Sequence, residues 1–205
     1  MSSPEPGPSL SPFHRAFDRL YPAIRFTYER LLGHQWFSQI EPRLWLGGAP
    51  TYGRDYELIL SSGITAVLDT RAERTSELAF YDSHGITHRQ FLVPDVTVPD
   101  ETVLTDAVAW IEDQIADDRT VLVHCAKGRG RSATVLAAYL MKADRMSFDA
   151  VRDLLQSKRA LVKLEDRHRR VLESWAASQR GLSGPSVRPP DPAGGDATRS
   201  RRQPD

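Results

Sequence analysis

The sequence predicts a single α/β domain, with a mainly parallel central sheet flanked by helices, from about residue 35 to 180. Short aliphatic strands alternate with longer helical stretches across this range, as in folds built from parallel strands. The segment 64–68 has few polar residues, which is typical of a strand covered on both faces of a sheet. A glycine-containing loop follows the aliphatic strand 121–124 and precedes a buried helix, and open α/β sheets bind ligands at such strand ends.

Composition limits the functional classes that need consideration. The chain has 205 residues and equal numbers of basic and acidic residues, 27 of each, so a cationic site must be local and nucleic-acid binding is not expected. A single cysteine excludes an internal disulfide and fits a reducing compartment such as the cytoplasm. No apolar run is long enough to span a membrane, and the first residues do not read as a signal peptide.

Both ends of the chain look unlike the middle. Residues 1–12 and 181–205 are rich in Pro, Gly and Ser and are predicted to be disordered. Residues 13–34 predict an amphipathic helical segment, which Pro22 kinks. Two hypotheses stay open for it: packing on the domain with its arginines in solvent, which we favour slightly, or lying on an anionic membrane surface. The apolar face comprises Phe13, Phe17, Leu20, Ile24, Tyr28 and Leu31, while the arginines Arg15, Arg19, Arg25 and Arg30 fall largely elsewhere.

The elements of the domain follow in order. Short strands are predicted at 38–40 and 43–47, a helix at 54–62 that ends at Gly63, and strands at 64–68 and 86–93. The charged segment 69–77 between them reads as a loop. Asp100 precedes a helical run and is predicted to cap it, so Asp95 in the preceding loop is the freer carboxylate. Further helices are predicted from Ser147 to about 157 and over 165–179.

The stretch 121–132 carries the candidate chemistry. His124 ends the strand, Cys125 opens the loop and Arg131 begins the helix. Backbone N–H groups in such a loop suit a phosphate, and the helix start adds free donors. Gly128 and Gly130 permit positive φ and a close approach to the anion. The same donors and cations should lower the pKa of the cysteine.

Other ligands fit the sequence less well. The loop lacks the Gly-Lys-Ser/Thr ending of a nucleotide-binding P-loop. The sequence also shows no clustered His/Cys ligand set. No metal and no cofactor are therefore expected, because Arg131 and the helix start supply the positive charge.

The motif His-Cys-x5-Arg-Ser between a strand and a helix resembles the signature of the cysteine-dependent protein-tyrosine phosphatase superfamily, dual-specificity type. This resemblance implies that Cys125 is the nucleophile, that Arg131 and the loop 126–130 bind phosphate, and that Ser132 assists the leaving thiolate. It implies a general acid on an upstream loop, for which we choose Asp95 over the alternatives Asp100 and Asp69. His124 is expected to orient the cysteine backbone. The reaction implied is metal-independent phosphomonoester hydrolysis through a phosphocysteine.

Extra cations in the loop bear on the substrate. Lys127 and Arg129 accompany Arg131 and suit a substrate with further negative charge, although both side chains can equally point to solvent. Residues 21–22, 36–50, 95–99, and 132–134 with 137–140 are similar to the mitochondrial-type phosphatidylglycerophosphate phosphatases. In that family Lys follows the nucleophile directly, whereas here Ala126 precedes Lys127, so the two side chains project differently.

This second resemblance implies a lipid phosphate substrate, such as phosphatidylglycerophosphate or a phosphoinositide. It also implies a mitochondrial location if the organism is a eukaryote. The alternative substrate is a phosphoprotein carrying phosphotyrosine, phosphoserine or phosphothreonine. Two functions of other classes stay open: a phosphate-binding pseudophosphatase that acts as an interaction module, and a rhodanese-like sulfur transferase, which the Arg and Ser after the loop fit less well.

Overall fold

The computed structural model describes residues 22–23, 25–31, 33–74 and 77–182. The predicted disordered stretch 1–12, the first part of the segment 13–34 and nearly all of the tail 181–205 lie outside these residues.

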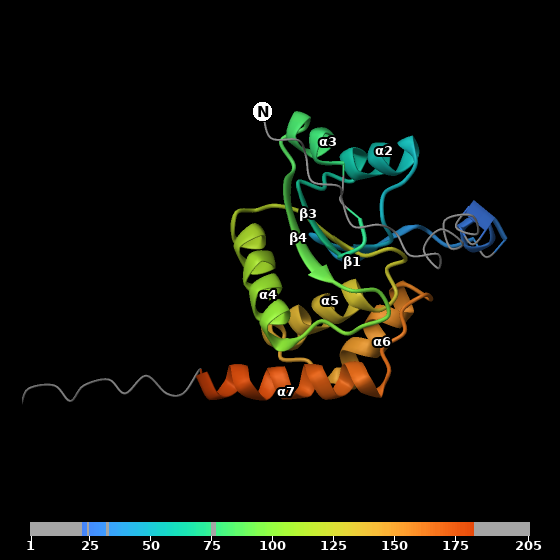
Figure 1. Ribbon diagram of the computed structural model, residues 1–205. Helices are drawn as coiled ribbons and strands as arrows, with labels where there is room; N and C mark the ends of the chain where they lie inside the picture. Colours follow the sequence, from blue (N-terminus) through green and yellow to red (C-terminus); the bar gives the residue numbers. More distant parts are fainter. Residues whose placement is uncertain (1–21, 24, 32, 75–76, 183–205) are drawn as a thin grey trace, which may run out of the picture.

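A five-stranded sheet forms the centre of the domain, in the order β1-β2-β5-β3-β4 (Figure 1). Only β1 runs antiparallel to its neighbour, and the other pairs are parallel. The prediction of an α/β domain with a mainly parallel sheet is therefore confirmed. Its strands are β1 (Phe37–Glu41), β2 (Leu44–Gly47), β3 (Ala66–Arg71), β4 (Thr87–Val93) and β5 (Val121–His124).

Helices cover both faces of this sheet (Figure 1). The helices α2 (Gly53–Ser61) and α3 (Leu78–Ser83) lie on one face, and α4 (Glu101–Ala116), α5 (Arg131–Ala143), α6 (Phe148–Lys158) and α7 (Asp166–Leu182) on the other. The central strand shows why both faces must be covered: Val121 and Val123 belong to the core beneath α4 and α5, whereas Leu122 belongs to the core beneath α2 and α3. Alternate side chains of a strand point to opposite faces, so β5 is buried on both.

The predicted helix starts are confirmed. The side chain of Asp100 accepts a hydrogen bond from the Val103 N–H at 2.8 Å, and Ser147 accepts one from the Ala150 N–H at 3.2 Å. Each bond satisfies one of the free N–H groups at a helix start. Asp100 is thus committed to capping α4.

Two features of the segment 69–77 differ from the predicted loop. Strand β3 continues through Arg71, and Asp69 is fully buried. The charges fit inside the fold because the Arg71 guanidinium donates to Asp69 at 2.8 Å, and a buried charge is tolerated when it is paired. The helix α3, which begins just after this segment, was not predicted, because six residues give little periodicity.

The described part of the N-terminal segment packs on the domain, and only part of the predicted apolar face is buried: Tyr28 is 4% exposed and belongs to the core. Arg25 is 1% exposed, while Leu31 and Phe26 are 67% and 58% exposed. The prediction that Arg25 points to solvent and that Leu31 lies on the buried face is therefore wrong. The physical reason is Asp55, a buried carboxylate of α2 that binds the Arg25 guanidinium at both oxygens, which periodicity alone does not reveal.

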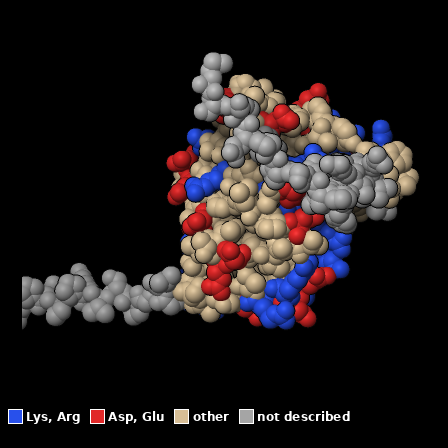
Figure 2. All heavy atoms as spheres, in the orientation of Figure 1, with Lys and Arg blue, Asp and Glu red and all other residues tan. Residues whose placement is uncertain are grey.

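None of the helices in the described ranges is long and apolar enough to cross a bilayer. On the face of the molecule seen in Figure 2, basic and acidic side chains are interspersed, in keeping with a net charge of zero.

Candidate active site

In the loop between β5 and α5, four consecutive carbonyl groups point away from the centre of the loop. Each of them accepts a hydrogen bond from a donor outside the loop, which leaves the backbone N–H groups facing inward. This arrangement is typical of an anion-binding nest. The pairs are Ala126 O with Ala49 N–H at 3.2 Å, Lys127 O with Arg159 Nη2 at 2.8 Å, Gly128 O with Arg159 Nε at 3.0 Å, and Arg129 O with Lys163 N–H at 2.9 Å.

Of the two loop glycines, only one has the predicted backbone conformation. Gly128 has a φ of 63°, and a Cβ there would lie 2.5 Å from the Gly47 carbonyl and 2.8 Å from Arg159 Nε. Gly130 has a φ of −123°, so the prediction of positive φ is wrong for it. The loop needs glycine at 128 for two reasons, conformation and space.

Cys125 lies at the floor of the loop, 3% exposed. Its Sγ accepts hydrogen bonds from the Gly128 N–H at 3.2 Å and from the Ser132 hydroxyl at 3.3 Å. Burial raises the pKa of the thiol, but the Arg131 cation and the Ser132 donors outweigh it, so the pKa lies below its ordinary value. The sulfur is therefore poised to be a thiolate nucleophile.

Arg131 is held from one side by a carboxylate that sequence analysis missed. Glu73 accepts from Nη1 at 2.7 Å and from Nη2 at 2.8 Å, and the Val93 carbonyl accepts from Nη1 at 3.0 Å. Burial raises the pKa of Glu73, yet the hydrogen bond from Arg131 overcomes it and keeps the pKa below its ordinary value. These bonds orient the guanidinium without using its Nε–H. No pattern near Glu73 signals this role.

The predicted general acid lies beside the same arginine. Asp95 Oδ1 is 3.0 Å from Arg131 Nη2, and its side chain is 36% exposed. Both alternative acids are engaged elsewhere, because Asp100 caps α4 and Asp69 pairs with Arg71. The structure thus brings Asp95, and neither alternative, to the loop.

His124, which precedes Cys125 in the chain, is fully buried. Its Nδ1 lies 3.7 Å from Asp69 Oδ1, and neither ring nitrogen has a hydrogen-bond partner among the described residues. Burial lowers the pKa of His124 to about 4, so the ring is neutral near pH 7. Its carbonyl accepts from the Thr70 hydroxyl at 3.1 Å, which fixes the backbone just before Cys125.

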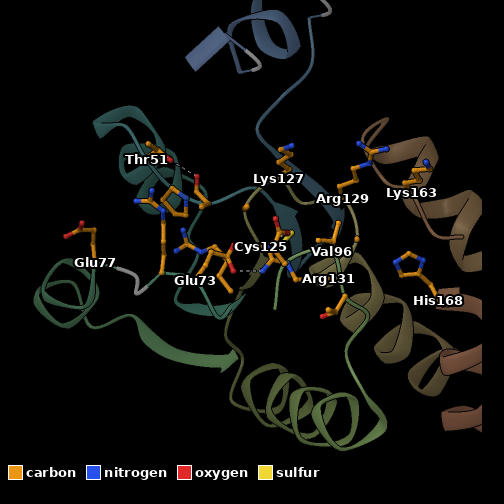
Figure 3. A pocket seen from close by; sticks show the side chains of 18 of the residues that line it. Thr51, Glu73, Glu77, Val96, Cys125, Lys127, Arg129, Arg131, Lys163 and His168 are labelled. Carbon is orange, nitrogen blue, oxygen red and sulfur yellow. Dashed lines mark hydrogen bonds and ion pairs between the residues drawn. The ribbon is translucent and has the colours of Figure 1, made fainter. Parts of the chain in front are cut away.

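The loop opens into a cleft of about 870 Å³, far larger than a phosphate ion needs. In Figure 3 the side chains of Lys127, Arg129, Lys163 and His168 lie to one side of Cys125. Lys163 is paired with Glu165 at 2.7 Å. Lys127 and Arg129 do line the cleft, together with Arg131.

His168 is a buried cleft residue that sequence analysis also missed. It is 1% exposed, and its Nδ1 accepts the Glu165 N–H at 2.9 Å. The acceptor role of Nδ1 places the proton of the neutral ring on Nε2. Burial lowers the pKa of this histidine.

Arg25 fixes one rim of the cleft from outside the sheet. Asp55 Oδ2, which Arg25 Nη1 contacts at 2.6 Å, also accepts the N–H groups of Thr51 at 2.8 Å and Tyr52 at 2.9 Å. Thr51 and Tyr52 line the cleft. The guanidinium lies 4.8 Å from the Tyr52 ring centre and 4.5 Å from that of Trp36, within the range of cation–π attraction.

Within the described ranges, no group of three or more His, Cys, Asp or Glu side chains is placed to hold a metal ion. A reactive cysteine in an anion-binding loop, an arginine after it and a carboxylate above it define the site as that of a cysteine-based phosphatase.

Comparison with known proteins agrees with the assignment of the site to a cysteine-based phosphatase. Residues 44–178 match the family described as "Dual specificity phosphatase, catalytic domain", and the chain belongs to this family. The predicted superfamily, dual-specificity type, is confirmed.

Relatives of two kinds resemble the chain. "Dual specificity protein phosphatase 12" of Mus musculus is 33% identical over 132 residues, which are 62% of this chain and 38% of the mouse protein. "Phosphatidylglycerophosphate phosphatase PTPMT2" of Arabidopsis thaliana is 29% identical over 167 residues, 80% of this chain and 72% of the plant protein. The chain thus spans well under half of the mouse relative and nearly three quarters of the plant one.

Solved structures support the fold. The one titled "Crystal Structure of PTPMT1 in complex with PI(5)P" superposes with a TM-score of 0.66 at 22% identity, and covers 73% of this chain and 100% of that chain.

Proposed function

We propose that this protein hydrolyses phosphomonoesters in two steps through a phosphocysteine intermediate. The observation that carries the proposal is the placement of Cys125: its Sγ lies at the floor of a loop whose four outer carbonyls are all bound from outside. A dianionic phosphoryl group placed there meets inward N–H groups and the Arg131 fork.

In the first step the Cys125 thiolate attacks phosphorus, and the phosphorus–oxygen bond to the leaving group breaks. Arg131 Nη2 contacts Asp95 at 3.0 Å, so an entering phosphoryl oxygen competes with Asp95 for this donor. Displaced from Arg131 and in its carboxylic acid form, Asp95 donates a proton to the leaving oxygen as the phosphorus–oxygen bond breaks, and it is left as a carboxylate.

In the second step a water molecule attacks the phosphocysteine. The Asp95 carboxylate accepts a proton from the water, the sulfur–phosphorus bond breaks, and inorganic phosphate and the thiolate are released. The Ser132 hydroxyl, 3.3 Å from Sγ, stabilises the departing thiolate by a charge-assisted hydrogen bond.

The substrate that the cleft supports best is a lipid phosphate. Its volume of about 870 Å³ leaves room beyond the phosphoryl group, and Lys127 and Arg129 line it, where they suit a second negative charge such as a phosphodiester. A phosphatidylglycerophosphate phosphatase is among the relatives. The second candidate is a phosphoprotein, which the relationship to a dual specificity protein phosphatase favours.

Turnover of 4-nitrophenyl phosphate in the presence of EDTA tests the reaction. Wild-type protein is expected to show vanadate-sensitive turnover, while Cys125→Ser abolishes turnover and keeps phosphate binding. Asp95→Asn is expected to lower the rate on poor leaving groups by about 10²–10⁴-fold. Wild-type turnover no higher than that of Cys125→Ser, with phosphate still bound, supports the pseudophosphatase; sulfur transfer from thiosulfate to cyanide supports the transferase.

A substrate panel separates the two substrate classes. Phosphatidylglycerophosphate, phosphoinositides and phosphotyrosine peptides are compared by kcat/KM. Lys127→Gln combined with Arg129→Gln is expected to lower kcat/KM for the lipids more than for 4-nitrophenyl phosphate. Equal losses on both substrates speak against a second anionic group at these residues.

We also propose that the N-terminal segment 13–34 contacts an anionic membrane surface. Phe26 and Leu31, both exposed, supply apolar side chains for such contact. Replacing both by Ser is expected to weaken binding to phosphatidylglycerol vesicles and to leave turnover of soluble 4-nitrophenyl phosphate unchanged. Unchanged vesicle binding speaks against contact through these two side chains.

A further inference from the structure

The residue after the general acid has an unfavourable backbone conformation. Val96 has a φ of 59°, the left-handed region that a β-branched residue rarely enters. Its side chain is largely exposed, at 73%, so side-chain packing does not offset the strain. Conformations of this kind are strained and persist only where the surroundings impose them.

Two sets of hydrogen bonds impose the left-handed conformation of Val96. Within the loop, Thr97 donates to the Pro94 carbonyl through its N–H at 3.3 Å and its hydroxyl at 2.7 Å. From outside the loop, Arg167 Nη1 donates to the Val96 carbonyl at 2.8 Å. Arg167 belongs to the first turn of α7, 71 residues away in the chain, and its Nε is held by Glu165 at 3.2 Å.

We propose that Arg167 is a positioning residue for the general acid: it latches the Val96 carbonyl and so holds the loop 94–97 in the strained form that presents Asp95 to the site. The peptide group that Arg167 grips directly follows the one joining Asp95 to Val96. Release of the Val96 carbonyl lets φ of Val96 relax to negative values, which redirects the adjacent Asp95. The inference rests on the proposed function, because Asp95 matters to the rate only as an acid and base.

The leaving group of the substrate reports the position of the acid. Phenyl phosphate needs protonation of its leaving oxygen, whereas 4-nitrophenolate leaves with far less help. We expect Arg167→Gln to lower kcat/KM for phenyl phosphate about tenfold, since small misplacements of a catalytic group have effects of this order, and to change that for 4-nitrophenyl phosphate less than twofold. Arg170→Gln, an exposed arginine of the same helix, is the matched control and should change neither.

A double-mutant cycle gives the decisive readout. In an Asp95→Asn background the acid is gone, so Arg167→Gln should cause no further loss on phenyl phosphate. A loss that persists there, or equal losses on both substrates in the wild-type background, overturns the proposal, because Arg167 then acts on the substrate or on the fold. If wild-type protein turns over no aryl phosphate, the proposed function itself fails.

Val96→Gly tests the strain directly. Glycine enters the left-handed region without a Cβ penalty, so the loss caused by Arg167→Gln on phenyl phosphate should be smaller in the Val96→Gly background than in the wild type. An equal or larger loss overturns the argument that the latch opposes backbone strain.

Discussion

Arg159, at the end of α6, is the residue whose replacement tests the architecture of the phosphate loop most severely. It is 1% exposed. Its guanidinium donates to the Lys127 and Gly128 carbonyls at 2.8 and 3.0 Å, and to the Trp36 and Gln35 carbonyls at 2.9 and 3.1 Å. Arg159→Met keeps an unbranched side chain as far as the position of Nε and removes these four hydrogen bonds.

The magnitude follows from the number of carbonyls left behind. A buried polar group without its partner costs about 1–3 kcal/mol, and partial hydration of the carbonyls reduces the sum. We expect Arg159→Met to lower the free energy of unfolding by about 4 kcal/mol, a large share of the 5–15 kcal/mol typical of a domain. Two of the carbonyls are those of Lys127 and Gly128, which become free to turn inward. Vanadate affinity should therefore fall at least about tenfold, or about 1.4 kcal/mol.

Urea unfolding measures the first effect, and the vanadate inhibition constant, taken where the variant is folded, measures the second. Lys158→Met is the matched control: the adjacent residue is exposed, so both quantities should stay close to wild type. Arg159→Lys separates charge from geometry, because one ammonium group cannot reach all four carbonyls. The reasoning is refuted if folded Arg159→Met binds vanadate as tightly as the wild type.

Three further predictions concern the loop and the N-terminal contact. Gly128→Ala should abolish turnover and lower stability, because residue 128 has a positive φ and an added Cβ would collide with the Gly47 carbonyl. Turnover and the urea midpoint of the variant test this, and values equal to those of the wild type contradict it. Arg25→Met should lower the free energy of unfolding by about 3–5 kcal/mol, since it leaves the Asp55 carboxylate buried without its cation. Urea unfolding measures this loss. A loss no greater than that caused by Arg30→Met contradicts the importance of the ion pair. The third prediction concerns pH. Burial raises the pKa of Asp55, but the hydrogen bonds from Arg25 and two backbone N–H groups outweigh it, so the folded-state pKa lies below the ordinary value. The contribution of Asp55 to stability is therefore complete above about pH 4 and is lost as the pH falls further. Asp55→Asn should make the urea midpoint depend less on pH below about pH 4. If the midpoint of this variant falls with pH as steeply as that of the wild type, the Asp55 carboxylate is not responsible.

The catalytic loop was predictable because its chemistry is contiguous in the chain. The proposed nucleophile, phosphate-binding arginine and assisting hydroxyl lie within residues 125–132, and the aliphatic strand before them places the loop at a sheet edge. Asp95 was chosen as the acid because the family resemblance implies one on a loop upstream of the signature strand, and because its neighbour Asp100 had a capping duty, which the structure bears out.

The supports of the loop were not predictable, because each reaches across the fold. Glu73 lies 58 residues from Arg131, and Arg159 lies 31 residues from Gly128. In the sequence Arg159 resembles any basic residue near the end of a helix, and Glu73 any charged loop residue. For the same reason Asp69 and Arg71 were assigned to a loop: their charges cancel only in the folded chain, as an ion pair.

The contacts around Trp36 place the start of the catalytic unit ahead of the family boundary at residue 44. The Trp36 carbonyl binds Arg159 at 2.9 Å, and its Nε1–H donates to the Ala49 carbonyl at 3.0 Å. The Ala49 N–H in turn binds the Ala126 carbonyl of the phosphate loop. The guanidinium groups of both Arg25 and Arg159 lie over the Trp36 ring. Removal of residues 1–34 therefore takes away the cation of Asp55 and a partner of Trp36 along with any membrane contact. A loss of lipid hydrolysis after such a truncation is no evidence for membrane binding, whereas substitution of exposed Phe26 and Leu31 leaves these contacts in place.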